Sequence, residues 1–129
     1  MRMIHLLTRP LLAALFVVGG IDVLLNPDPR AKLAAPVVEQ VGRAASTVPL
    51  DPLNAVRANA VTHIVAGSML GMSILPRLAA LTLAASLLPT TWAGHRFWEL
   101  EEPTQRAQQR THFLKNVAIL GGLLDAAFL

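Results

Sequence analysis

The chain of 129 residues has no cysteine and no tyrosine, and only 15% of its residues are charged. Without cysteine it can form no disulfide, no thiolate nucleophile, no zinc–thiolate site and no iron–sulfur cluster held by cysteine. Any redox role must therefore depend on a bound cofactor or on a partner protein. A soluble domain carries about a quarter charged residues, so the shortage of charge argues against a surface that faces water on every side.

The few charged residues are unevenly spread. They crowd into residues 26–57 and 96–115, while 53% of the whole chain is hydrophobic. Each helix of a soluble bundle needs a polar face, so this distribution favours helices surrounded by lipid. The net charge is only +3, and no basic cluster is interleaved with aromatic residues, so nucleic acid is not expected as a partner. The basic excess suits anionic lipid headgroups instead.

Four apolar segments are predicted to cross the membrane. The first covers residues 6–25, about 20 residues or roughly 30 Å of helix, which is the thickness of the hydrocarbon core. Asn26-Pro27 should end it. A cleaved signal peptide is the alternative for this segment, but Asp22 interrupts the apolar run and no small-x-small cleavage site follows it.

Proline positions set the limits of the other segments. Asp51 can cap a helix and Pro52 suits its first position, so a second helix should run from there to Leu75, before Pro76. A third helix is predicted over 77–99, with a kink near Pro89. The fourth should begin at Pro103 with polar turns that project from the membrane. The membrane crossings of these three helices are predicted at about 55–75, 77–97 and 113–129.

Residues 26–51 form a polar connection rich in proline. Within it, residues 36–45 place Val37, Val38 and Val41 at helical spacing, which favours a short amphipathic helix at the membrane surface. A solvated loop is the alternative. The sequence therefore predicts an all-α fold, an integral membrane four-helix bundle in one domain, 1–129, of a multi-pass plasma-membrane protein.

Antiparallel connection of four helices would bring most of the polar residues to one side of the membrane. A charged residue at the bilayer centre costs about 2.5–3.5 kcal/mol, so such residues usually face inward or form pairs. One interpretation is structural, with Asp22 paired to Lys115 or Arg96. Another is a binding pocket for a polar head such as a quinone carbonyl. The candidate residues are Asp22, Asn59, His63, His95, Arg96, Glu99, His112, Lys115 and Asn116.

A metal site is a third interpretation of the same residues. It would use His63, His95, His112, Asp22 and Glu99. Neither the HxxxH nor the ExxH spacing that places two ligands on one helix face occurs among them, so no metal is predicted.

Glycines predict where helices approach one another. Gly67 and Gly71 form a GxxxG pair on the face that also carries Asn59 and His63, so another helix should pack there. The pairs Gly19-Gly20 and Gly121-Gly122 suggest similar contacts. Trp92, Phe97 and Trp98 are typical of an aromatic anchor at the membrane interface.

No catalytic apparatus is evident in the sequence. Ser68, Ser73 and Ser86 have no histidine three or four residues away, and there is no phosphate loop or dinucleotide fingerprint. The sequence thus does not predict an enzyme that acts on its own.

Three stretches resemble the DoxX family in its actinobacterial form. These are RPLLAALFVVGGID at 9–22, LPRLAALTLAASLLPTTWAGHRFWE at 75–99 and HFLKNVAILGGLL at 112–124. The GHRFW and HFLKN elements, in this order and spacing, are the most specific part. They place the family's recurrent positions at Gly94, His95, Phe97, Trp98, His112, Phe113, Lys115 and Asn116.

The resemblance implies a four-helix membrane protein linked to quinone chemistry. It also implies partners in some members, namely superoxide dismutase and a thiosulfate sulfurtransferase in a complex that resists oxidative stress. The leading hypothesis is a non-enzymatic membrane subunit that anchors or supports such a redox complex. The alternatives are a quinone-binding subunit of a membrane oxidoreductase, and a structural or lipid-organising protein with no redox role. The oligomeric state stays open.

Overall fold

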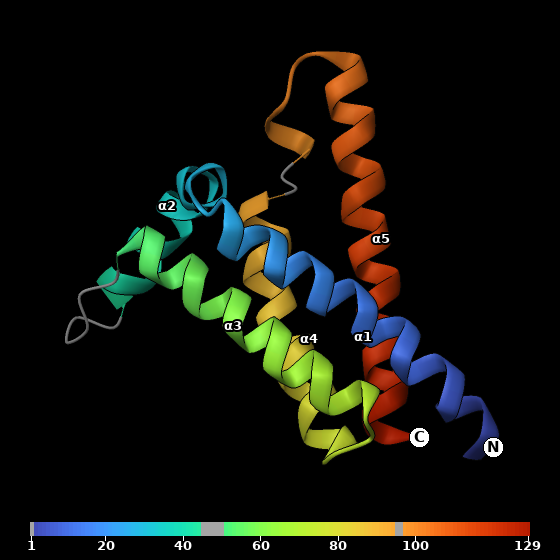
Figure 1. Cartoon of the computed structure of the whole chain (residues 1–129). Coiled ribbons are helices and arrows are strands. Elements are labelled where there is room, and N and C mark those ends of the chain that lie inside the picture. Colours follow the sequence, from blue (N-terminus) through green and yellow to red (C-terminus); the bar gives the residue numbers. More distant parts are fainter. Residues whose placement is uncertain (1, 45–50, 95–96) are drawn as a thin grey trace.

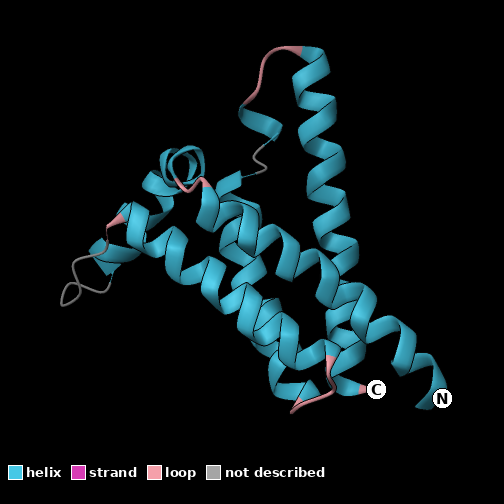
Figure 2. Cartoon of the chain, in the orientation of Figure 1, coloured by secondary structure: helices cyan, strands magenta, loops and turns pink. Residues whose placement is uncertain are grey.

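A computed structural model describes residues 2–44, 51–94 and 97–129. Within these ranges the fold is all-α, with five α-helices, one short 3-10 helix and no strand. Figure 2 shows helix through nearly all of the described chain, with loops confined to the turns. The predicted all-α class is confirmed. The helices are α1 (Arg2–Leu25), α2 (Asp28–Ala44), α3 (Pro52–Gly71), α4 (Pro76–Gly94), η1 (Phe97–Glu99) and α5 (Pro103–Phe128).

The starts of α3 and α5 agree with the sequence prediction. Proline stands at the first position of both helices, where its missing N–H would have no intrahelical acceptor. Asp51 is the N-cap of α3, and its backbone is extended, but its side chain makes no capping hydrogen bond. Glu102 caps α5 through its carboxylate, which accepts from the backbone N–H of Thr104 and of Gln105.

Three predicted boundaries were wrong. The helix expected at 36–45 is α2, which begins at Asp28 because Pro29 fits a first turn, and it continues through Pro36. The second predicted helix ends at Gly71 and not at Leu75, since Ser73 and Leu75 take positive φ angles of 58° and 43° that no α-helix contains. The third helix, α4, ends at Gly94 rather than at 99, and residues 97–99 form η1.

The helices are arranged in an antiparallel order (Figure 1). α1 and α3 lie side by side, α4 packs against α3, and α5 packs against α4, while α2 contacts both α3 and α4. The end of α1, the start of α3, the end of α4 and the start of α5 point toward the same end of the molecule. Successive helices of the set α1, α3, α4 and α5 therefore run in opposite directions, with α2 in the connection between α1 and α3. The N-terminal part of α5 projects beyond the other helices (Figure 1).

The tightest packing lies near the turn from α3 to α4, which we call the closed end and define by Leu70, Ala80, Leu83 and Leu123. All four residues are 0% exposed. Ala79, Ala126 and Ala127 belong to the same buried cluster. Small and branched apolar side chains from three helices therefore fill this end.

Glycines allow α1 and α3 to approach closely. A Cβ on Gly67 would lie 3.2 Å from Phe16 Cβ, one on Gly71 would lie 3.0 Å from Ala13 Cβ, and one on Gly20 would lie 2.8 Å from the Ala60 carbonyl oxygen. The GxxxG face of α3 thus packs on α1.

The other member of each glycine pair behaves differently from the sequence prediction. Among the described residues, nothing lies within 4 Å of a Cβ on Gly19 or Gly121, whereas one on Gly122 would lie 3.4 Å from Leu12 Cδ2. Successive residues of a helix point about 100° apart, so two adjacent glycines face different directions. Within the described part of the chain, Gly121 therefore makes no close contact with a neighbouring helix.

Among the described residues, one helix is long and apolar enough by composition to cross a membrane. It is Met3–Leu25, with a mean hydropathy of 1.8. The other helices carry more polar residues, such as Asn59 and His63 in α3. Large apolar side chains nevertheless point outward on all of them. Examples from α3, α4 and α5 are Val65 at 53% exposed, Leu88 at 58% and Leu114 at 57%.

Candidate functional site

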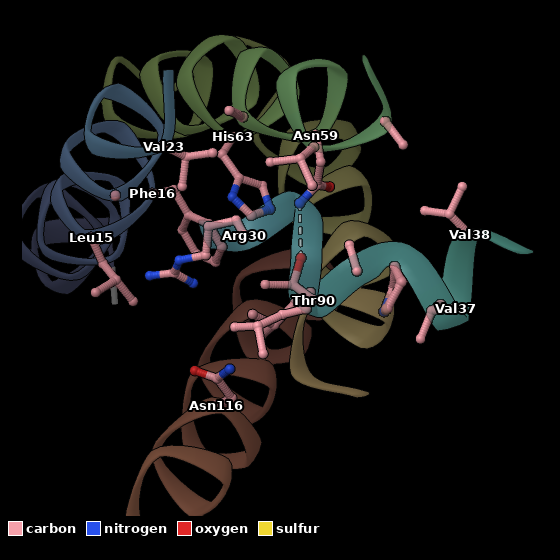
Figure 3. Close-up of a pocket in the computed structure, with 18 residues that line it drawn as sticks. Leu15, Phe16, Val23, Arg30, Val37, Val38, Asn59, His63, Thr90 and Asn116 are labelled. Atoms are coloured by element: carbon pink, nitrogen blue, oxygen red, sulfur yellow. Dashed lines mark hydrogen bonds between the residues drawn. The ribbon is translucent and has the colours of Figure 1, made fainter. Parts of the chain in front are cut away.

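A cavity of about 470 Å³ lies at the other end of the molecule, which we call the open end and define by Asn59, His63, Thr90 and Asn116. All five α-helices contribute to its wall (Figure 3). Most of the lining is apolar. The lining residues are Leu15, Phe16, Gly19, Val23, Arg30, Leu33, Ala34, Val37, Val38, Ala55, Val56, Asn59, Ala60, His63, Leu87, Pro89, Thr90 and Asn116.

Two polar bridges join α3 to α4 at this cavity. Asn59 Nδ2 donates to Thr90 Oγ1 at 2.8 Å, the dashed line in Figure 3, and His63 Nε2 lies 2.9 Å from Ser86 Oγ. Asn59 and His63 are one helical turn apart, as are Ser86 and Thr90. Because the two helices are antiparallel, the earlier residue of one pair meets the later residue of the other. One turn of α3 therefore lies opposite one turn of α4, and both pairs of side chains meet.

The ring of His63 is held on two sides. Ser86 Oγ donates to the Leu83 carbonyl oxygen at 2.9 Å, so its lone pairs are free to accept from His63. This favours the tautomer with hydrogen on Nε2, which leaves Nδ1 as an acceptor. Phe16 meets the ring edge-to-face, with centroids 5.1 Å apart and planes at 77°. The ring is thus oriented at the cavity wall (Figure 3).

A third bridge joins α4 to α5. Asn116 Nδ2 donates to Thr91 Oγ1 at 3.0 Å. Figure 3 shows Asn116 on α5 below Thr90, on the side of the cavity away from Asn59 and His63. An amide has two N–H groups and one carbonyl oxygen, so Asn59 and Asn116 each keep hydrogen-bonding capacity beyond the bridge. The open end therefore combines apolar walls with a few hydrogen-bond donors and acceptors.

Arg30 is the charged side chain among the described lining residues. It lies in the first turn of α2 and is exposed. Its guanidinium extends beside the cavity toward the side on which Leu15 lies (Figure 3). The cavity thus has a cationic group at its rim rather than at its floor.

The structure separates the polar residues that the sequence grouped together. Asn59, His63 and Asn116 line the cavity. Asp22, Glu99, His112 and Lys115 are exposed and lie outside the lining. His95 and Arg96 lie outside the described residues.

The expected pairing of Asp22 with Lys115 is absent from the described part of the chain. Ala13, Phe16 and Gly20 are the buried residues of α1. Asp22 follows Gly20 by two positions, or about 200° around the helix, so it points away from the buried face. The Asp22 carboxylate therefore faces outward and does not pair with Lys115 of α5.

The sequence analysis does not predict the contributions of Phe16, Arg30, Ser86, Thr90 and Thr91 to the site. Ser86 has no histidine close to it in the sequence, because its partner His63 stands 23 positions earlier. Arg30 was assigned to the connection, and no local pattern places that connection over a cavity. The matching i, i+4 spacings of 59/63 and 86/90 were the one available signal.

The aromatic residues expected at the interface lie in one group with a residue of α5. Trp98 contacts Trp92, Phe97 and Phe113, with ring centroids 5.3, 5.3 and 5.8 Å apart. Phe97 and Phe113 also meet at 5.5 Å. Trp92 and Trp98 are 51% and 40% exposed. These rings connect the end of α4 to α5 beside the cavity.

A metal site finds no support among the described residues. No group of three or more His, Cys, Asp or Glu side chains there is placed to hold a metal ion. Of the proposed ligands, His63 lines the cavity, whereas Asp22, Glu99 and His112 are exposed and do not line it.

A family model matches most of the chain. The family model described as DoxX matches residues 4–96. This range includes α2 to α4, all of α1 except its first two residues, and every lining residue of the cavity except Asn116. The HFLKN element at 112–116 lies beyond it. Neither a search of curated proteins nor a search of solved structures finds a match. The match covers well over half of the chain, which therefore belongs to the DoxX family of membrane proteins.

Proposed function

We propose that the chain is a multi-pass plasma-membrane protein in which α1, α3, α4 and α5 cross the bilayer as a four-helix bundle. The outward apolar side chains support this, since Leu11, Val65, Leu88 and Leu114 are each more than half exposed. In water such a surface would favour aggregation, whereas lipid tails solvate it. The GHRFW element at 94–98 and the HFLKN element at 112–116 support the actinobacterial form of the family.

We propose further that the bundle binds a quinone and so supports a membrane redox complex. The observation that carries this proposal is the cavity whose apolar walls end in Asn59, His63 and Thr90. Its volume of about 470 Å³ lies within the range of about 300–1,000 Å³ common for small-molecule sites. A quinone has a flat apolar ring with two polar oxygens, and this matches the lining.

The residues of the open end have distinct parts in this proposal. The amides of Asn59 and Asn116 can donate to the carbonyl oxygens of a quinone. Nδ1 of His63 can accept from the hydroxyl of the reduced form. The chain itself supplies no electrons; it holds the carrier where an enzyme partner oxidises or reduces it.

The quinone site is tested by thermal melting of purified protein in nanodiscs with and without decylubiquinone. A ligand at about 100 times its Kd stabilises the folded state by about 2.7 kcal/mol, so the melting temperature of the wild type should rise. His63→Phe and Asn59→Leu should each weaken binding about fivefold, since each removes one hydrogen bond of about 1 kcal/mol.

Matched controls are His5→Phe and Asn54→Leu, because neither residue lines the cavity. Both controls should respond to decylubiquinone as the wild type does. Absence of any shift in the wild type would reject the quinone site. Stabilisation by phospholipid alone, with none by quinone, would favour the lipid-organising alternative.

A specific observation also favours the anchoring role. The first turns of α5 are polar, almost entirely exposed, and project beyond the other helices (Figure 1). Arg106 and Arg110 lie on this segment and are both exposed. We propose that it contacts the soluble partners, with superoxide dismutase and a thiosulfate sulfurtransferase as candidates from the family resemblance.

Co-purification from native membranes tests this anchor. Wild type and Arg77→Gln, a control in the first turn of α4, should retain the partner, whereas the double variant Arg106→Gln/Arg110→Gln should retain much less. If no redox protein accompanies the wild type, the anchor proposal fails.

A further inference from the structure

The mouth of the cavity is marked by those lining residues that remain exposed. Leu15 is 51% and Leu33 is 48% exposed, and Gly19 is also classed as exposed. By contrast, the lining residues Phe16, Ala60 and Leu87 are at most 5% exposed. Arg30 and Pro89 are the other exposed lining residues. Four of these five residues lie on α1 or the first half of α2 and Pro89 lies on α4, so the opening lies mainly along α1 and the first half of α2.

The position of the mouth along α1 indicates which layer of the membrane it opens toward. Leu15 stands near the middle of Met3–Leu25, the helix that qualifies as a membrane span. It precedes Leu25 by about 15 Å of helix at 1.5 Å per residue, which is half of a hydrocarbon core of about 30 Å. Arg30 lies beyond the end of α1, in the first turn of α2. The mouth thus extends from the depth of the lipid tails toward the depth of the headgroups.

Gly19 keeps this mouth wide. No described residue has an atom within 4 Å of a Cβ built on it, and it lines the cavity. Its neighbour Gly20 is packed against Ala60 and Ile64 instead. A larger side chain at position 19 would therefore occupy the mouth without displacing a helix.

We propose that the cavity is entered sideways from the bilayer, through the mouth beside Leu15 and Gly19, by an amphiphile whose tail stays in that mouth while its head reaches His63 and Asn59. This inference rests on the proposed quinone site, and it names the ligand class as a long-tailed molecule dissolved in the membrane. Arg30 lies at the rim of the cavity, with its guanidinium on the side of Leu15 (Figure 3). The ligand is then oriented as the surrounding lipids are.

The test compares a quinone with a tail and one without. Decylubiquinone and duroquinone are titrated against nanodisc-embedded wild type, Gly19→Leu and Gly121→Leu, and each Kd is obtained from the melting shift at increasing ligand. A leucine at position 19 would take up the space that the tail occupies in the mouth, and forcing both into that space is unfavourable, so Gly19→Leu should weaken decylubiquinone binding at least about tenfold. Binding of duroquinone should change less than about twofold.

Gly121→Leu is the matched control, because Gly121 also has open space beside it but does not line the cavity. It should bind both quinones as the wild type does. Leu15→Trp gives an independent obstruction of the mouth, with Leu11→Trp as its control on the exposed face of α1. The melting temperatures without ligand establish that each variant is folded.

The results separate this inference from the proposed function. Selective loss of decylubiquinone in Gly19→Leu and Leu15→Trp supports the lateral mouth. Unchanged binding of both quinones, or equal loss of both, would overturn it while leaving the quinone site in place. If the wild type binds neither quinone, the proposed function itself is rejected, and the lateral mouth with it.

Discussion

The closed end and the open end are built from the same helices but by different contacts. At the closed end, Leu70, Leu83 and Leu123 from α3, α4 and α5 meet with no exposed surface. At the open end, hydrogen bonds such as Asn59–Thr90 and Asn116–Thr91 join the same three helices. Small and branched apolar side chains allow close packing over the whole contact, whereas a polar bridge fixes two points and leaves space between them.

This difference teaches that stability and the candidate site are separated along the bundle. Dispersion contacts add up over a filled core, so the closed end should carry most of the packing energy. The open end joins its helices through hydrogen bonds between polar side chains, while a cavity of about 470 Å³ remains beside them. Substitutions at the two ends should therefore have different effects on unfolding and on ligand binding.

The largest effect is expected for Leu83→Ala at the closed end. Leu83 is 0% exposed, and truncating a buried leucine costs about 2–5 kcal/mol of unfolding free energy. Leu81→Ala is the control on the same helix, because Leu81 is 41% exposed. Equilibrium unfolding in detergent measures both variants. Equal losses for the two would show that the closed end is not the main source of stability.

A smaller loss is expected for Gly20→Ala where α1 meets α3. The added Cβ would lie 2.8 Å from the Ala60 carbonyl oxygen, so the two backbones must separate, at a cost of about 1–3 kcal/mol. Gly19→Ala has open space and should be neutral, or stabilise the helix by up to about 1 kcal/mol. Thermal melting of the two variants compares adjacent positions directly. A Gly20→Ala variant as stable as Gly19→Ala would contradict the close approach of these helices.

A still smaller effect is expected for the bridge between α4 and α5. A double-mutant cycle with Asn116→Leu and Thr91→Val should give a coupling of about 0.6 kcal/mol, and not more than about 1.7, as for other hydrogen bonds between membrane helices. Unfolding free energies of the four proteins provide the value. A coupling well above about 1.7 kcal/mol would contradict the view that hydrogen bonds at the open end contribute less to stability than packing at the closed end.

The smallest effect concerns Glu102, which lies beyond the open end at the start of α5. Hydrogen bonds donated by the backbone N–H groups of Gln105 and then Thr104 lower the pKa of its carboxyl below the ordinary value. A lowered folded-state pKa means that the cap stabilises the helix fully above the ordinary pKa and is lost as the pH falls through the lowered one. The amide shift of Gln105, followed by NMR from about pH 7 to about pH 3, should therefore titrate below the ordinary glutamate range.

Glu102→Gln provides the control for this measurement. It removes the titrating group, so the acid transition of the Gln105 amide should vanish while the helix stays folded. A wild-type transition at or above the ordinary glutamate pKa would show that the carboxylate does not cap the helix in solution.

Local features were predictable from the sequence because their causes are local. Pro52 and Pro103 begin helices since proline fits a first turn. Gly67 and Gly71 face a neighbouring helix since small residues permit close approach. The end of α3 could not be predicted, because Ser73 and Leu75 adopt left-handed backbone angles that neither residue type favours. The connection from α3 to α4 imposes them.

The candidate site was only partly predictable. Asn59, His63 and Asn116 stand out because polar side chains are rare in apolar helices. Ser86 and Thr90 do not, since serine and threonine commonly bond to carbonyls of their own helix, as Thr90 does to the Ser86 carbonyl oxygen. Asp22 stands out equally in the sequence, yet it points away from the buried face of α1.

The sequence by itself determined an all-helical chain with apolar outer faces, the starts of α3 and α5, and the GxxxG face of α3. Composition, periodicity and proline chemistry act over one or two helical turns, so a single sequence is enough to read them. Only the tertiary structure decided which polar residues share a cavity, that α2 with Arg30 forms part of its wall, and that Gly19 lies at its mouth rather than in a helix contact. Those outcomes depend on the rotation of each helix about its own axis, which is set by the packing of residues far apart in the chain.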